Sequence, residues 1–210
     1  MAAEPEATLR RRAIRLALLI VIWDVLEGAI AVTAGIVAGS VALIGFGIDS
    51  TIEVFAAVVV LLHLRGGRSV GGRWALRAIA VTFWLLATYI SVEAVGELIA
   101  GADADASPAG IALNIAALVV MVPVAVAQTR TGRQLANQVV VAQAKETWLS
   151  NALSVNVLIG LGLNAAFGWA WADPLVALVV AGFAAYAGVD SWRESSESAS
   201  DREPSSEPPS

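Results

Sequence analysis

The chain has 210 residues, of which 58% are hydrophobic and 15% are charged, and its mean hydropathy is +0.74. This composition excludes a soluble domain and predicts an all-α, polytopic membrane protein with about six transmembrane helices of roughly 20 residues each. The chain contains no cysteine, which excludes a disulfide framework and a thiolate metal site. The net charge of −5 is less informative, because the charges are sorted by position.

Six apolar runs follow one another along the chain. We expect transmembrane helices at about 13–37, 41–64, 78–100, 109–128, 134–167 and 173–189. The fifth run is long and polar at its start. The sequence therefore predicts a cytoplasmic N-terminal segment at 1–12 and a six-helix membrane domain at 13–190. It also predicts a disordered cytoplasmic tail at 191–210, which is rich in Ser, Glu and Pro.

Arginines mark alternate connections between these runs. They occur before the first run and after the second and fourth, whereas the other three connections hold no Lys or Arg. By the positive-inside rule, both termini of this multi-pass protein should lie in the cytoplasm. We expect the membrane to be a bacterial-type plasma membrane. The arginines concerned are Arg10, Arg11, Arg12, Arg15, Arg65, Arg68, Arg73, Arg77, Arg130 and Arg133.

Two carboxylates occupy the middle of the second run. Asp49 and Glu53 are four residues apart, which on a helix places both on one face, about 6 Å apart. An ionised carboxylate in hydrocarbon costs roughly 2.5–3.5 kcal/mol on insertion scales, and two close together repel. We expect this pair to bind a cation. The alternative is a protonated pair, or one hydrogen-bonded to neighbouring helices.

The start of the fifth run carries two polar stripes. Thr147, Asn151 and Ser154 fall at i, i+4 and i+7, and Glu146 and Ser150 form a second stripe one residue round. Oxygen atoms from either stripe are suitable ligands to complete the shell of a hard cation. Which stripe faces Asp49 stays open, because one residue of helix rotation is about 100°. Ordinary interhelical hydrogen bonding is the alternative, and it is favoured for Ser154.

Four further charged residues fall inside predicted helices. Asp24 and Glu27 lie on one face of the first run, and they are candidates for an access path or a proton path, as is Glu93 in the third. Asp24 and Glu27 are equally suited to pair with the polar start of the fifth run. Lys145 is a candidate counter-charge for Glu146 or Asp49, or it extends to the cytoplasmic interface.

Other functions have no support in the sequence. There is no pair of a nucleophile and a histidine within the membrane, and no glycine loop that follows a strand and would bind phosphate. We therefore expect no enzyme activity and no prosthetic group. Membrane topology explains the arginine-rich loops, so we expect no nucleic-acid partner.

Several segments resemble the cation diffusion facilitator (cation efflux) transporters. They are Ala-Gly-Ser-Val-Ala-Leu at 38–43, the Asp49/Glu53 pair, and Gly-Trp-x-Trp-Ala-Asp-Pro at 168–174, and the resemblance covers about residues 10–190. It implies export of divalent cations in exchange for protons by a homodimer. It also implies a metal site of Asp49 and Glu53 with Thr147 and Asn151, where the family carries His and Asp instead of the latter two.

This resemblance implies a short form of the family, in which the tail replaces the usual cytoplasmic C-terminal domain and a homodimer forms through the membrane helices. We expect a divalent cation/proton antiporter that works by alternating access. The cation would be Zn²⁺, Mn²⁺, Co²⁺, Fe²⁺ or Cd²⁺, and an all-oxygen site favours harder ions such as Mn²⁺ or Mg²⁺. The alternatives are a membrane scaffold or partner subunit with a degenerate metal site, and a passive cation channel.

Overall fold

The computed structural model describes residues 5–38, 41–66, 71–100, 108–169 and 171–200. The described residues form six α-helices and no strand, which confirms the predicted all-α bundle. Helices suit such an apolar chain, because lipid offers no hydrogen bonds and each helix satisfies its own backbone groups. The helices are α1 (Glu6–Ala38), α2 (Val41–Arg65), α3 (Gly72–Ala100), α4 (Pro108–Gln134), α5 (Gln138–Phe167) and α6 (Ala172–Ser200).

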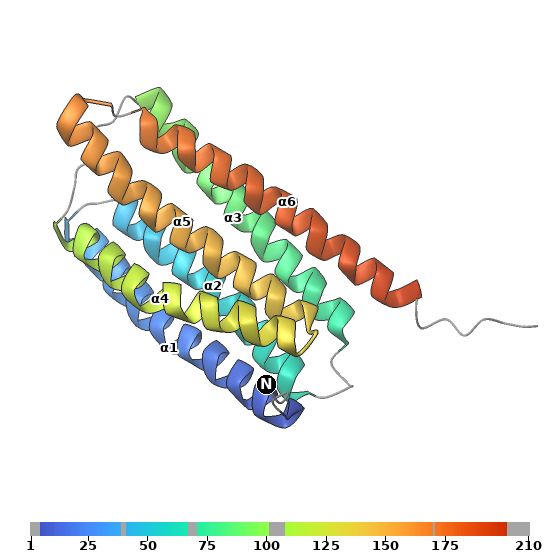
Figure 1. Ribbon diagram of the computed structural model, residues 1–210. Coiled ribbons are helices and arrows are strands. Elements are labelled where there is room, and N and C mark those ends of the chain that lie inside the picture. Colours follow the sequence, from blue (N-terminus) through green and yellow to red (C-terminus); the bar gives the residue numbers. More distant parts are fainter. Residues whose placement is uncertain (1–4, 39–40, 67–70, 101–107, 170, 201–210) are drawn as a thin grey trace, which may run out of the picture.

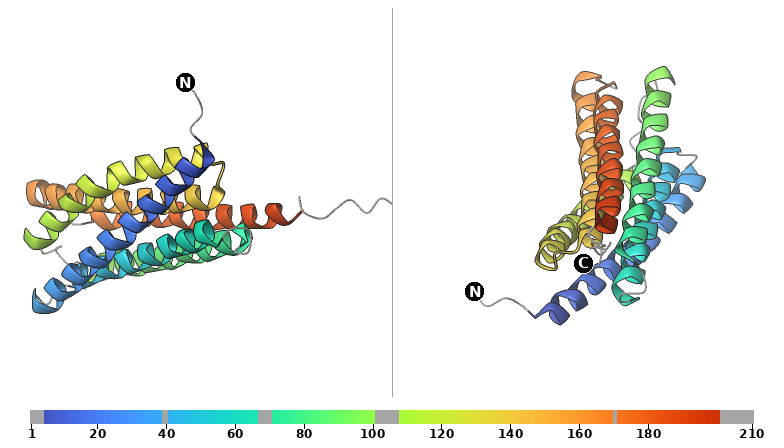
Figure 2. Two further views of the ribbon diagram at one scale, coloured as in Figure 1. Left: turned by 90° about the horizontal axis from the view of Figure 1, so that it is seen from below. Right: turned by 90° about the vertical axis from the view of Figure 1, so that its right-hand side faces the viewer.

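The helices pack in three pairs. Helices α1 and α4 lie on one side, α3 and α6 lie on the other, and α2 and α5 lie between them (Figure 1). Further views show α1 crossing the bundle obliquely (Figure 2). Helix α5 contacts α2, α3, α4 and α6. The two helices that carry the predicted metal ligands, α2 and α5, are therefore neighbours at the centre of the bundle.

Helices α1 and α2 approach closely where both carry glycine. A Cβ atom at Gly28 would lie 3.3 Å from Ser50 Cβ and 3.4 Å from Gly47 O, so a larger residue there would separate the helices. Small residues are the usual means by which helices pack closely in membranes. This contact brings the first-helix carboxylates next to Asp49 and Ser50 of α2.

Helix α6 packs along α3 beyond its predicted end. The sequence predicted a disordered tail from residue 191, but α6 is helical through Ser200, so that boundary was placed too early. The reason is tertiary contact: the Trp192 ring lies 5.5 Å from the Trp84 ring, and the Arg77 guanidinium lies 4.9 Å from the Trp192 ring. Arg77 Nε also donates to Ser195 Oγ at 3.4 Å.

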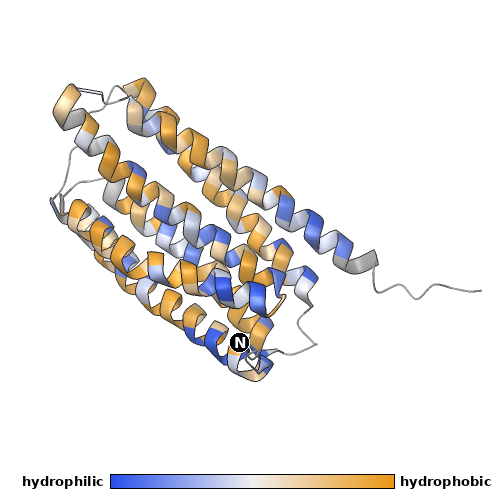
Figure 3. Ribbon diagram, in the orientation of Figure 1, coloured by the Kyte–Doolittle hydropathy of each residue, from blue (hydrophilic) through white to orange (hydrophobic). Residues whose placement is uncertain are grey.

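Most of the bundle has the surface of a membrane protein. Hydrophobic residues dominate its outer faces, and hydrophilic ones gather at the end where α1 begins and α6 ends (Figure 3). By length and composition, five described helices are able to cross a membrane, namely α1, α2, α3, α4 and α6. Helix α5, which carries the polar stripes, is not among the five that the described residues yield. Its central place among four neighbours accommodates those polar side chains.

The arginine-bearing connections meet at one end of the bundle. Arg10 Nε, at the start of α1, donates to Leu64 O, at the end of α2, at 2.9 Å. Asn137 Nδ2, at the start of α5, lies 3.3 Å from His63 Nε2, near the same end of α2. This common end agrees with the sorting of charge in the sequence. Arg68 and residues 1–4, 39–40 and 201–210 lie outside the described residues.

Candidate metal centre

Asp49 and Glu53 lie one turn apart on the inner face of α2. Their side chains are 8% and 6% exposed, so both carboxylates are buried within the bundle. The spacing of four residues accounts for their common direction. Asp49 Oδ1 and Glu53 Oε1 accept no hydrogen bond from the described part of the chain. One oxygen of each carboxylate is therefore available to a ligand.

Helix α5 meets this pair through a serine. Ser150 Oγ lies 2.7 Å from Asp49 Oδ2 and 3.1 Å from Glu53 Oε2. A hydroxyl has one proton, so it donates a full hydrogen bond to only one of these oxygens at a time. The remaining negative charge needs a proton or a cation. Ser150 thus connects α5 to both carboxylates of α2.

A cavity adjoins the two carboxylates. Four of the five predicted ligands, Asp49, Glu53, Thr147 and Asn151, lie in its wall. The structure therefore brings residues of both helices together. Helix α5 meets the pair with residues of both stripes, because Ser150 contacts Asp49 while Thr147 and Asn151 line the cavity. The remaining lining residues are Glu27, Phe46, Ser50, Ala117, Met121 and Ser154.

Glu146, the fifth predicted ligand, does not lie in the cavity wall. Its side chain is 1% exposed and lies beside Thr82 of α3. It still acts electrostatically with Asp49 and Asp24. The rotation of α5 thus directs Glu146 toward α3 and Thr147 toward the cavity.

The two carboxylates of α1 extend the acidic region. Glu27 lies in the cavity wall beside Trp23 and Ser50, and it is 4% exposed. Asp24 is 1% exposed, and neither of its oxygens accepts a hydrogen bond from the described residues. Glu53 interacts electrostatically with both of them. Five buried carboxylates therefore share the centre of the bundle.

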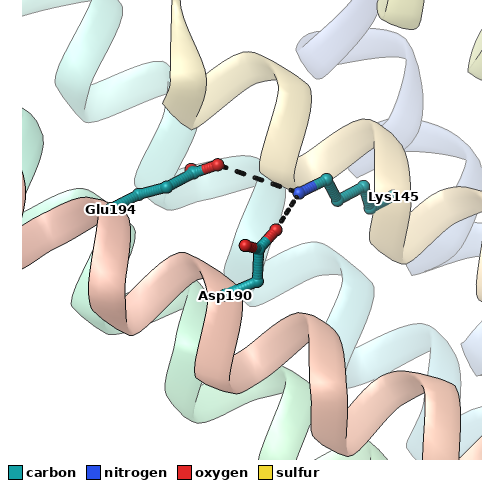
Figure 4. A network of polar contacts seen from close by, with 3 residues as sticks. All are labelled: Lys145, Asp190 and Glu194. Atoms are coloured by element: carbon teal, nitrogen blue, oxygen red, sulfur yellow. Dashed lines mark hydrogen bonds and ion pairs between the residues drawn. The ribbon is translucent and has the colours of Figure 1, made fainter.

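In the part of the chain that the structure describes, no positive side chain forms an ion pair with these carboxylates. Within the described residues, none of the five is in an ion pair, and the pairs of Lys145 are formed elsewhere. Lys145 Nζ lies 2.6 Å from Asp190 Oδ2 and 4.0 Å from Glu194 Oε1, both on α6 (Figure 4). Neither Asp49 nor Glu146 is its partner, contrary to the counter-charge that the sequence suggested. Lys145 instead joins α5 to α6 near the arginine-rich end.

The described residues do not form a ready-made metal cage. Among them, no group of three His, Cys, Asp or Glu side chains converges to hold a metal ion. A cation in the cavity would therefore meet the carboxylates of Asp49 and Glu53, with that of Glu27 in the same wall, and hydroxyl and amide oxygens and water in the rest of its shell. Hard divalent cations accept such oxygen-rich shells.

Glu93 lies apart from the cavity. Its side chain is half-buried on α3, next to the Tyr89 hydroxyl, and a Cβ at Gly45 of α2 would approach both side chains. Gly45 is one turn before Asp49 on α2. Glu93 therefore lies between the cavity and the end of the bundle opposite the arginines.

Comparison with known proteins identifies the family. A family model, the cation efflux transmembrane domain, matches residues 75–198, which is more than half of the chain. The chain belongs to the cation efflux family. The match runs from α3 to α6 and includes Ser150 and the predicted ligands of α5. The resemblance inferred from sequence is thus confirmed, and the protein is a multi-pass membrane protein of this family.

A relative matches a larger share of the chain than the family model does. The chain is 28% identical over 186 residues to a Synechocystis sp. protein, the uncharacterized transporter sll1263. The aligned part covers 83% of this chain and 58% of that relative. The chain therefore spans less than two thirds of the relative's length.

Two residues of this cavity were hard to single out from the sequence. Ser150 belongs to one of the two polar stripes of α5, and the sequence left open which stripe faces Asp49. Its contact with Asp49 and Glu53 depends on the rotation of α5. Met121 of α4 had no polar pattern to mark it, yet it lies in the cavity wall. Only the fold places these side chains beside the carboxylates.

Proposed function

We propose that this protein exchanges a divalent cation for protons, and that the cation binds between α2 and α5. The observation that carries the proposal is the pair Asp49 and Glu53, buried at a cavity and sharing one Ser150 hydroxyl. Intramembrane carboxylates without a basic partner are costly unless a cation or proton visits them. The cation efflux family supplies the transport function, and the site suggests the cargo.

Asp49 and Glu53 are the proposed charged ligands. Thr147 and Asn151 supply neutral oxygens from α5. Glu146 is a further candidate ligand, but α5 would have to rotate for its carboxylate to reach the cation. Two carboxylates neutralise a divalent charge, which supports a divalent cargo over a monovalent one. The neutral oxygens in the positions of Thr147 and Asn151 favour weaker binding than the His and Asp of the family resemblance.

Proton exchange follows from the same carboxylates. A carboxylate must lose its proton to bind a metal, so cation binding releases protons and proton binding expels the cation. Asp24, Glu27 and Glu93 are the proposed access and proton path. Asp24 lies toward the arginine-rich end from the cavity, Glu27 lies in its wall, and Glu93 lies toward the opposite end. Alternating access would open the cavity to these two ends in turn.

The proposed setting is a plasma membrane with both termini in the cytoplasm. The clustering of arginines at one end of the bundle supports that orientation. A homodimer formed through the membrane helices is also proposed, by likeness to the family.

Metal binding to the purified protein in detergent tests this function. Calorimetry with Mn²⁺, Zn²⁺, Co²⁺, Cd²⁺ and Mg²⁺ should show binding with proton release by the wild type, and Asp49→Asn should lose it. Ser91→Ala is the control, because Ser91 lies on α3 and bonds only Ala87 O among the described contacts. Binding that survives Asp49→Asn, or no binding by the wild type, would contradict the proposal.

A further inference from the structure

The wall of the cavity, as the described residues form it, includes one methionine. The chain has two methionines and no cysteine, and the second methionine, Met121 of α4, lines the cavity together with Asp49 and Glu53. Its side chain is 3% exposed. The one histidine, His63, lies ten residues beyond Glu53 on α2, about 15 Å along the helix, and contacts Asn137. Among the described residues, Met121 is therefore the single soft donor near the carboxylates.

The packing of α4 directs Met121 toward the site. Ala117, one turn before it, also lines the cavity, so α4 presents this face to α2 and α5. Met121 belongs to a buried cluster with Ile20 of α1 and Ala57 of α2. Ala57 is one turn after Glu53 on α2, and Met121 and Glu53 line the same cavity. A methionine side chain has three rotatable bonds and a polarizable sulfur, so small rotations move the sulfur between core and cavity.

We propose that Met121 determines the specificity of the cation site by offering its thioether sulfur as a soft ligand beside Asp49 and Glu53. The inference rests on the proposed function and names its cargo class. A neutral thioether competes poorly with water for Mg²⁺ or Ca²⁺, but it binds softer ions such as Cd²⁺, Co²⁺ and Fe²⁺. Carboxylates alone bind all of these ions. The sulfur would therefore add discrimination in favour of transition cations over the abundant hard ones.

The alternative role for Met121 is to fill space in the cluster with Ile20 and Ala57. Met121→Leu separates the two roles, because it keeps the volume and apolar character of the side chain and removes only the sulfur. A purely packing role predicts no change in the ratio of affinities between soft and hard cations. A ligand role predicts a change in that ratio with the fold intact.

Calorimetry of the purified full-length chain with Cd²⁺, Co²⁺, Mg²⁺ and Ca²⁺ is the first measurement. We expect Met121→Leu to weaken Cd²⁺ binding by about tenfold and to leave Mg²⁺ and Ca²⁺ binding unchanged. Val120→Leu is the matched control on α4. Val120 is partly buried and packs against the same cluster, but it does not line the cavity. Equal affinity ratios in wild type and Met121→Leu would overturn the inference and leave the proposed function standing. Failure of the wild type to bind any of the four cations would overturn both.

X-ray absorption gives a direct readout of the contact. Selenomethionine labels only Met1 and Met121 in this chain. The selenium edge of the Cd²⁺-loaded protein should show a cadmium neighbour that is absent from labelled Met121→Leu. A selenium environment of light atoms alone, in protein that calorimetry shows to be loaded with Cd²⁺, would overturn the inference.

Discussion

Ser150 Oγ lies 2.7 Å from Asp49 Oδ2, and this contact joins α5 to α2 at the centre of the bundle. The same oxygen lies 3.1 Å from Glu53 Oε2, so one hydroxyl fixes the positions of both proposed charged ligands. Side chains that orient metal ligands commonly influence affinity as strongly as weak ligands do. Ser150 is therefore the most informative neutral residue to change.

We expect Ser150→Ala to lower cation affinity by about 10–100-fold, the usual effect of removing a group that orients metal ligands. Without the hydroxyl, the two carboxylates lose their common donor and repel each other into separate rotamers. Calorimetric titration of detergent-solubilised protein measures this change. Ser91→Ala serves again as control, and equal affinities in the two variants would show that Ser150 has no such role.

The rotation of α5 predicts different effects for two adjacent residues. Thr147 lines the cavity, whereas Glu146 lies beside Thr82 of α3. We expect Thr147→Val to weaken cation binding, because it removes an oxygen and keeps the shape. Glu146→Gln should change the affinity less than Thr147→Val does, because Glu146 does not line the cavity and acts on Asp49 only through electrostatics. A loss of binding in Glu146→Gln alone would mean that α5 presents its other stripe to the cation.

The site illustrates what sequence patterns reveal. The pairing of Asp49 with Glu53 follows from a spacing within one helix, so it was predictable from residues alone. The choice between Glu146 and Thr147 depends on the rotation of α5 against α2, which no local pattern fixes. The contact of Lys145 with Asp190 joins residues 45 positions apart. The length of α6 likewise depends on the packing of Trp192 against α3. The polar composition near the C-terminus gives no sign of this packing.

The ion pair between Lys145 and Asp190 should contribute little to stability. The two side chains are 37% and 39% exposed, and exposed pairs are typically worth about 0.2–1 kcal/mol. We expect a double-mutant cycle with Lys145→Gln and Asp190→Asn to give a coupling energy in that range. Because Lys145 faces α6 and not the cavity, Lys145→Gln should also leave cation affinity unchanged. A large loss of affinity would restore Lys145 as a counter-charge of the site.

Close packing of α3 with α6 predicts an effect of Gly188→Ala. A Cβ at Gly188 would lie 3.2 Å from Ala80 O and close to the Trp84 ring, so we expect overpacking to cost about 1–3 kcal/mol of stability. Gly182→Ala on the same helix is the matched control, since a Cβ there meets nothing within 4 Å. Thermal unfolding in detergent should therefore show a lower Tm for Gly188→Ala only. Equal Tm values would indicate that α3 and α6 adjust without strain.

Cation affinity should fall as the pH falls. Protons and cations compete for Asp49 and Glu53, so each step toward acid favours the proton-bound form and weakens cation binding. Titrations in buffers of different ionisation enthalpy count the protons released. In Asp49→Asn, any residual binding should release fewer protons. Affinity that is independent of pH would remove the carboxylates from the binding step.

The most direct test of the central claim is transport by purified protein in sealed liposomes, with a pH-sensitive dye inside and Mn²⁺ or Cd²⁺ outside. We predict that cation entry alkalinises the lumen because protons leave in exchange, that an imposed pH gradient drives cation flux, and that Asp49→Asn and Glu53→Gln abolish both signals. Cation flux that proceeds without proton movement, or that persists in these variants, would contradict an exchange mechanism centred on Asp49 and Glu53.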